Sequence, residues 1–74
     1  MEPTSEERQA QVRALLFLNL EQWIEHPHDT PHYKMMVRSC KLKYGECFVK
    51  EVLKALTKKH VEIYAQRVEE LWTW

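Results

Sequence analysis

The amino-acid sequence predicts an all-α protein, a small bundle of three to four helices. Apolar residues recur at the three- and four-residue spacing of helices over long stretches of the chain. One glycine and three prolines are too few for the many turns of a β-sandwich or β-barrel. Because the chain has only 74 residues, we expect a single domain, residues 1–74, with one small core.

The first helix is expected to end at Glu25, because Pro27 forbids its continuation. Thr4 and Glu7 have the spacing of a capping box at its start. Large apolar side chains surround most of this helix, which is more apolar surface than two or three short helices can cover. We therefore predict a homodimer whose interface includes this helix. The expected interface residues are Val12, Leu15, Leu16, Leu18, Leu20 and Trp23.

A second helix is expected to start with Thr30 as its N-cap and Pro31 in the first helical position. It should run to about Tyr44 and stop at Gly45, a natural left-handed C-cap. One face of this helix is apolar and consists of Met36, Val37, Cys40 and Tyr44.

The rest of the chain contains neither glycine nor proline and is expected to be helical. Its first apolar face consists of Phe48, Val49, Val52, Leu53, Leu56 and Ile63. A second stripe, out of line with the first, consists of Val61, Tyr64, Val68 and Leu71. This slip predicts a break near Thr57–His60 and a fourth helix over about 61–73; one continuous bent helix is the alternative.

Charges are segregated along the chain although they sum to zero. The net charge is −4 over residues 1–29, +6 over residues 30–60 and −2 over residues 61–74. On helices, the central cations form two rows with a spacing of about one turn. The first basic ridge is Lys34, Arg38 and Lys41, and the second basic ridge is Lys50, Lys54 and Lys58.

The two basic ridges predict a non-enzymatic module that binds the phosphates of nucleic acid. If the two helices pack as an antiparallel hairpin, both ridges flank a common surface that matches the phosphate rows of a duplex. Duplex RNA is favoured over a specific DNA site, because arginine is scarce in this region and A-form RNA is recognised by shape and backbone. Two other interpretations stay open: the ridges are simply solvated, or the acidic flanks neutralise them.

The alternative function is a protein–protein adaptor or homodimerisation module. It would dock through the apolar first helix and the two tryptophans near the end of the sequence, Trp72 and Trp74. Trp72 is nevertheless expected to complete the core of the domain, as large aromatic side chains commonly do. Salt separates the two functions, because phosphate binding weakens steeply as salt rises and apolar docking does not.

Several classes of site find little support in the sequence. Histidines 26, 28, 32 and 60 and the two cysteines lack the spacing of a structural zinc site, since six residues separate Cys40 from Cys47. Cys47 and His60 would form a catalytic pair only across a bend. No apolar run is long enough for a membrane span or a secretory signal. We therefore expect no catalysis, metal, cofactor, disulfide or membrane insertion, and an intracellular setting, cytoplasmic or nuclear.

Overall fold

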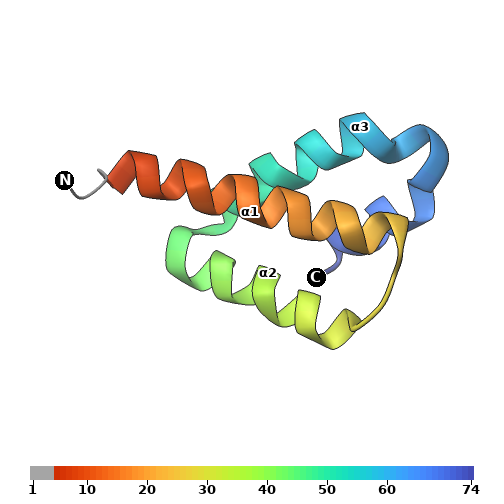
Figure 1. The fold of residues 1–74 in the computed structure, drawn as a ribbon, viewed down its shortest axis with the longest axis horizontal. Coiled ribbons are helices and arrows are strands. Elements are labelled where there is room, and N and C mark those ends of the chain that lie inside the picture. Colours follow the sequence, from red (N-terminus) through yellow and green to blue (C-terminus); the bar gives the residue numbers. More distant parts are fainter. Residues whose placement is uncertain (1–4) are drawn as a thin grey trace.

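The computed structural model describes residues 5–74, and these residues form three helices and no strand. The helices are α1, Ser5–Glu25, α2, Thr30–Tyr44, and α3, Glu46–Trp72. Each helix contacts the other two, so the all-α fold class and the bundle are confirmed (Figure 1). The predicted capping box involves Thr4, which lies outside the described residues. None of these three helices has the length and apolarity that a membrane span requires.

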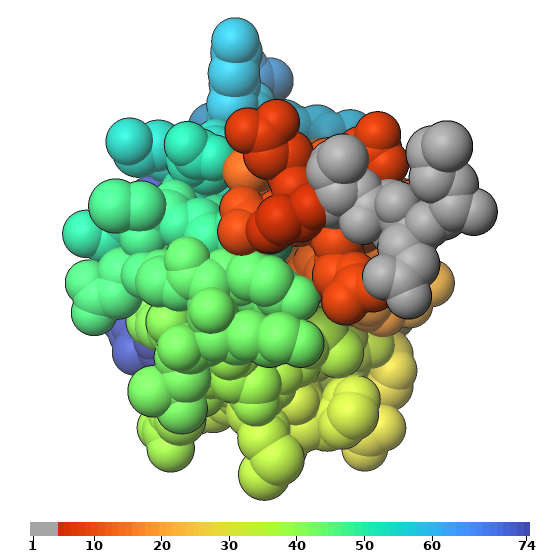
Figure 2. Space-filling view, turned by 90° about the vertical axis from the view of Figure 1, so that its left-hand side faces the viewer, coloured from red at the N-terminus to blue at the C-terminus, as the bar shows by residue number. Residues whose placement is uncertain are grey.

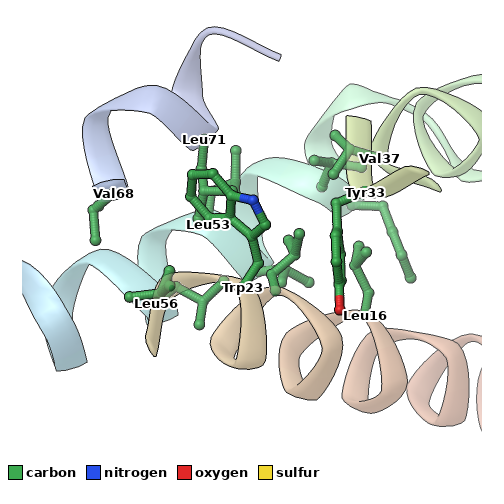
Figure 3. Close-up of a cluster of buried hydrophobic side chains, with 13 residues drawn as sticks. Leu16, Trp23, Tyr33, Val37, Leu53, Leu56, Val68 and Leu71 are labelled. Atoms are coloured by element: carbon green, nitrogen blue, oxygen red, sulfur yellow. The ribbon is translucent and has the colours of Figure 1, made fainter. Parts of the chain in front are cut away.

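The core is formed by one side of each helix, and Trp23 of α1 lies within it (Figure 3). Val37 of α2 and Leu56 of α3 have no accessible surface. The apolar face predicted for α2 is confirmed, because Val37 is buried and its other three members pack against the core; Tyr33 was missed. The buried apolar side chains are Leu16, Leu20, Trp23, Ile24, Tyr33, Val37, Phe48, Val49, Val52, Leu53, Leu56, Val68 and Leu71.

The connection between α1 and α2 differs from the prediction, because Asp29 and not Thr30 is the N-cap of α2. Asp29 has a left-handed backbone conformation, with φ 47° and ψ 42°, and its carbonyl accepts hydrogen bonds from the N–H groups of His32 and Tyr33. The Thr30 hydroxyl instead accepts a hydrogen bond from the indole Nε1 of Trp23 at 3.1 Å. Thr30 therefore satisfies the polar atom of a buried tryptophan rather than the end of a helix.

Gly45 ends α2 as predicted and starts the turn into α3. Its N–H donates to the carbonyl oxygen of Lys41 at 2.9 Å. Its φ of +95° is open to glycine, while its ψ of 162° lies outside the left-handed helical region that was expected. This single residue reverses the chain, so α3 packs back against α2.

The bend in α3 falls at Tyr64, beyond the predicted break at Thr57–His60. Tyr64 has non-helical angles, φ −121° and ψ 37°, although the helix continues on both sides to Trp72. The predicted break is therefore present at Tyr64, later than Thr57–His60, with a helical stretch on each side of it. Ile63 was expected in the core and is 80% exposed, because the bend follows immediately.

The bend turns the segment 65–74 back onto the bundle (Figure 1). Val68 and Leu71 are buried by this reversal, which confirms half of the second predicted stripe, whereas Val61 is exposed. Near the start of the segment, Nη1 of Arg67 donates to the carbonyl of Ile24 at 2.6 Å. The carbonyls at the end of a helix lack intrahelical partners, so Arg67 caps the C-terminal end of α1.

The two tryptophans of this segment differ from the prediction, because Trp74 and not Trp72 packs against the core. The Trp74 ring packs edge-on against Trp23, with 4.7 Å between the ring centroids. Trp72, which was expected to complete the core, is 40% exposed and donates its indole N–H to the Thr57 hydroxyl at 2.9 Å. Trp74 therefore contributes more to the core than Trp72 does.

Candidate nucleic-acid interface

The six predicted phosphate-binding residues lie on the outer sides of α2 and α3. In the first basic ridge, Lys34 and Arg38 are exposed and Lys41 is half-buried. All three lysines of the second basic ridge are exposed on the part of α3 that precedes the bend. On α3 the direction of the second ridge follows from the helical period, because Val52 and Leu56 on the opposite side of the helix are buried. On α2 the first ridge borders the buried Val37 rather than lying opposite it, and its member Lys41 is half-buried.

The two ridges approach each other at a hollow of about 130 Å³ beside the turn at Gly45. Lys41 contributes to it from α2 and Lys50 from α3, so one cation of each ridge faces the same space. The walls of the hollow are formed by Lys41, Glu46, Val49, Lys50, Leu53 and Trp72. Glu46 is the one carboxylate in this lining, which leaves the hollow with an excess of positive charge.

The segment 65–74 contacts both ridge-bearing helices on this side of the molecule. The Lys41 ammonium group donates a hydrogen bond to the backbone oxygen of Trp74, and Trp72 is bonded to Thr57 of α3. Figure 2 shows the end of the chain in dark blue beside the green and teal residues where α2 turns into α3. The open surface expected between the ridges is therefore partly occupied by the protein's own chain, and one residue of each ridge lines the hollow.

None of the six cations forms an ion pair with a carboxylate among residues 5–74. The ion pairs present there use other cations. Arg13 lies 3.5 Å from Glu51, and Lys59 and His60 share one carboxylate oxygen of Glu21. The interpretation that the acidic flanks neutralise the basic segment thus applies to Lys59 and not to either ridge.

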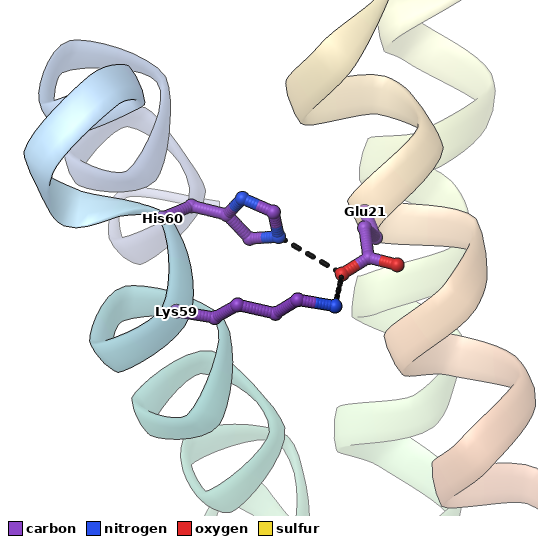
Figure 4. Close-up of polar contacts among 3 residues, drawn as sticks. All are labelled: Glu21, Lys59 and His60. Carbon is purple, nitrogen blue, oxygen red and sulfur yellow. Dashed lines mark hydrogen bonds and ion pairs between the residues drawn. The ribbon is translucent and has the colours of Figure 1, made fainter.

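Glu21, Lys59 and His60 form a polar cluster between α1 and α3 (Figure 4). Lys59 Nζ lies 2.7 Å and His60 Nε2 2.9 Å from the same Glu21 oxygen. The hydrogen bond from Lys59, followed by the one with His60, lowers the pKa of Glu21 against the opposing effect of burial. Sequence analysis missed this cluster; its only signal is that Glu21 and His60 border the apolar faces of their helices.

The residues predicted for a dimer interface fall into two groups. Leu16, Leu20 and Trp23 are buried in the core of the chain itself, so they do not form an outer surface of the folded chain, and Val12 packs partly against the same core. Leu15 and Leu18 are 59% and 55% exposed. One apolar side of α1 therefore forms part of the core of the chain itself. The other apolar side, with Leu15 and Leu18, faces outward and is available to another chain.

The cysteines and histidines are spread over the structure. Cys40 is half-buried and Cys47 exposed, and both are free thiols. Burial raises the pKa of the Cys40 thiol, which keeps it protonated at neutral pH. The part of the chain from residue 5 onward contains no group of three or more metal-binding side chains. His60 faces Glu21 and Tyr64, so its imidazole is engaged away from the exposed Cys47.

Comparisons with protein-family models, curated proteins and solved structures gave no match to this chain. The fold and the surface define a small helical bundle with a basic face made by α2 and the first part of α3. The chemistry of that face is the basis for assigning a function.

Proposed function

We propose that the protein is a non-enzymatic module that binds the phosphate backbone of duplex RNA through its two basic ridges, independently of sequence. The observation that carries this proposal is that all six cations of the ridges lack an ion pair with a carboxylate among residues 5–74. Lys34, Arg38, Lys50, Lys54 and Lys58 can therefore each neutralise a phosphate and release a counterion at no loss of an ion pair among the described residues. Lys41 would also give up its hydrogen bond to the Trp74 backbone oxygen.

The spacing of the ridges favours a duplex over isolated phosphates. Lys50, Lys54 and Lys58 follow one another every four residues, so their Cα atoms span about 12 Å along the helix axis. A row of this length faces several phosphates of one strand, because each strand of a DNA duplex carries one charge per roughly 3.4 Å of the helix axis. Lysine contacts of this kind position a protein on the backbone and carry no sequence information.

A salt titration with duplex RNA tests the proposal. We expect Arg38→Ala and Lys54→Ala each to weaken binding and to reduce the slope of log affinity against log salt by about one unit. The matched control is Arg13→Ala, since Arg13 is also exposed but lies on α1 and belongs to neither ridge. If Arg38→Ala and Lys54→Ala bind like the wild type with an unchanged slope, the proposal is wrong. Duplex DNA and single strands in parallel measurements establish which nucleic acid is preferred.

The adaptor function is favoured by one observation, the exposure of Leu15 and Leu18 on α1. The tryptophans give it less support, because Trp23 is buried in the core and Trp74 packs against it. Partner binding that is insensitive to salt and to alanine at the ridge lysines, but is lost in Leu15→Asp, would favour the adaptor.

A further inference from the structure

One row of exposed side chains runs along the side of α1 that faces away from the core. Its members occur at alternating intervals of three and four residues, which is the spacing of a coiled-coil seam. Every one of them is exposed. The outer seam of α1 consists of Arg8, Gln11, Leu15, Leu18, Gln22 and Glu25.

The outer seam is chemically self-complementary when it is reversed. Its centre is a pair of leucines, each leucine is followed outward by a glutamine, and the two ends carry opposite charges. Reversing the order therefore places leucine on leucine, glutamine on glutamine and arginine on glutamate. A two-fold axis between two antiparallel helices produces this reversal, because an isologous interface pairs each residue with its counterpart in both directions.

We propose that α1 pairs with α1 of a second copy of this chain in an antiparallel arrangement. Leu15 then packs against Leu18 of the second copy, and Gln11 lies against its Gln22. Arg8 lies against Glu25 of the second copy, and the same contact recurs at the other end of the interface. This inference is independent of the proposed RNA binding, since the outer seam contains no residue of either basic ridge.

The terminal charges select the antiparallel arrangement over a parallel one. Arg8 and Glu25 have no ion pair within the described residues, and 17 residues of helix separate them by about 25 Å. A parallel pair would place Arg8 on Arg8 and Glu25 on Glu25, and like charges across a helix interface are unfavourable. In the antiparallel pair both contacts join opposite charges.

The seam is also accessible in the folded chain. The inner side of α1 is covered, because Leu16, Leu20 and Trp23 face α2 and α3. The six seam residues on the other side of α1 are all exposed. Four leucines, two from each copy, form the apolar centre, so the interface is smaller than that of an obligate dimer. We therefore expect a dimer in reversible exchange with the monomer.

Sedimentation equilibrium from about 1 μM to about 1 mM protein, without nucleic acid, tests the pairing. We expect the mean mass of the wild type to rise from that of the monomer toward that of the dimer. Leu15→Asp should remain monomeric throughout. Ile63→Asp is the matched control and should dimerise like the wild type, since Ile63 is even more exposed than Leu15 but lies on α3 at the bend.

Charge exchange tests the direction of the helices. Arg8→Glu and Glu25→Arg each create two like-charge contacts in the antiparallel dimer, so each should dimerise several-fold more weakly. The double variant Arg8→Glu/Glu25→Arg recreates both opposite-charge contacts and should recover the affinity of the wild type. Circular dichroism verifies that every variant is folded.

Two results would overturn the proposal. One is a wild type that stays monomeric over the whole concentration range. The other is a double variant that dimerises no better than Arg8→Glu alone, since recovery depends on Arg8 meeting Glu25 of the other copy. Neither result concerns affinity for RNA, so the pairing and the proposed function fail separately.

Discussion

The guanidinium group of Arg67 donates a hydrogen bond to the carbonyl of Ile24, with 2.6 Å between Nη1 and the oxygen. The same Nη1 lies 3.4 Å from the carbonyl of Glu25, so one cation satisfies the last carbonyls of α1. The guanidinium also lies over the Tyr64 ring, 5.2 Å from its centroid. Arg67 thus connects the end of α1 to the residue where α3 bends.

Arg67→Met should lower the free energy of unfolding by about 1–3 kcal/mol, because it removes charged hydrogen bonds and leaves carbonyls of α1 without a partner. Methionine retains most of the apolar contact of the side chain, so the loss reports mainly on the hydrogen bonds. Urea denaturation measures the change. Arg38→Met, at an exposed position of α2, should differ from the wild type by less than about 0.5 kcal/mol. Equal losses in both variants would contradict the capping role of Arg67.

The cluster of Glu21, Lys59 and His60 should make stability depend on pH below neutrality. The pKa of Glu21 is lower in the folded chain than its ordinary value, so its ionised form stabilises the fold. This stabilisation is present above the unfolded pKa of about 4.3 and is lost as the pH falls through the lowered folded value.

Accordingly, Glu21→Gln should be less stable than the wild type at about pH 7, and the difference should shrink as the pH approaches about 3. Urea denaturation at several pH values provides the measurement. Glu62→Gln, at an exposed position of α3, is the matched control and should show a much smaller difference. A difference for Glu21→Gln that is the same at every pH would contradict the stabilisation by the carboxylate.

Replacing Gly45 by any L-amino acid should destabilise the fold through backbone strain and not through a steric clash. Nothing lies within 4 Å of a β-carbon built at this position, while its φ of +95° is strained for any L side chain. Gly45→Ala should therefore cost about 1–3 kcal/mol of stability. Chemical synthesis with D-alanine at residue 45 adds the same methyl group without this strain and should be tolerated. If the L- and D-alanine proteins are equally destabilised, contact rather than backbone strain is the cause.

Two leucines two positions apart on α1 should respond very differently to truncation. Leu20 has no accessible surface, so Leu20→Ala should cost about 2–5 kcal/mol through lost burial and the cavity left behind. Leu18 is 55% exposed, and Leu18→Ala should cost less than about 0.5 kcal/mol when measured on dilute protein. Thermal unfolding of both variants at low micromolar concentration makes the comparison. Similar losses would mean that the two sides of α1 are not distinguished in solution.

Helical periodicity was sufficient to predict much of the fold. Val49, Leu53 and Leu56 follow the helical period directly, and Gly45 is a local signal that needs no tertiary information. The predictions are wrong at positions whose environment is determined by residues distant in the sequence. Thr30 has a typical capping sequence, but its hydroxyl bonds a tryptophan seven residues earlier. Ile63 continues the apolar spacing of α3, but the bend at Tyr64 leaves it in solvent, and Arg67 stabilises that bend through a contact 43 residues away.

The candidate site was predictable in part. The exposure of the second ridge follows from the same periodicity that buries Val52 and Leu56. That Lys41 and Lys50 share a hollow depends on how α2 and α3 pack, and the periodicity of each helix alone does not determine this. The position of Trp74 beside Lys41 and Trp23 depends on the reversal of the chain at Tyr64. No local sequence pattern predicts this reversal.

The bend at Tyr64 also bears on the order in which the structure forms. Joining Arg67 to Ile24 directly in an unfolded chain would close a loop of 43 residues, and the entropy lost in closing a loop grows with its length. Once α3 has packed beside α1, His60 already lies against Glu21. The loop that remains to be closed before Arg67 reaches Ile24 then consists only of the few residues of the bend. Seating the segment 65–74 then closes a short loop in place of a long one. Assembly of the three-helix frame before this final closure is therefore the entropically favoured route.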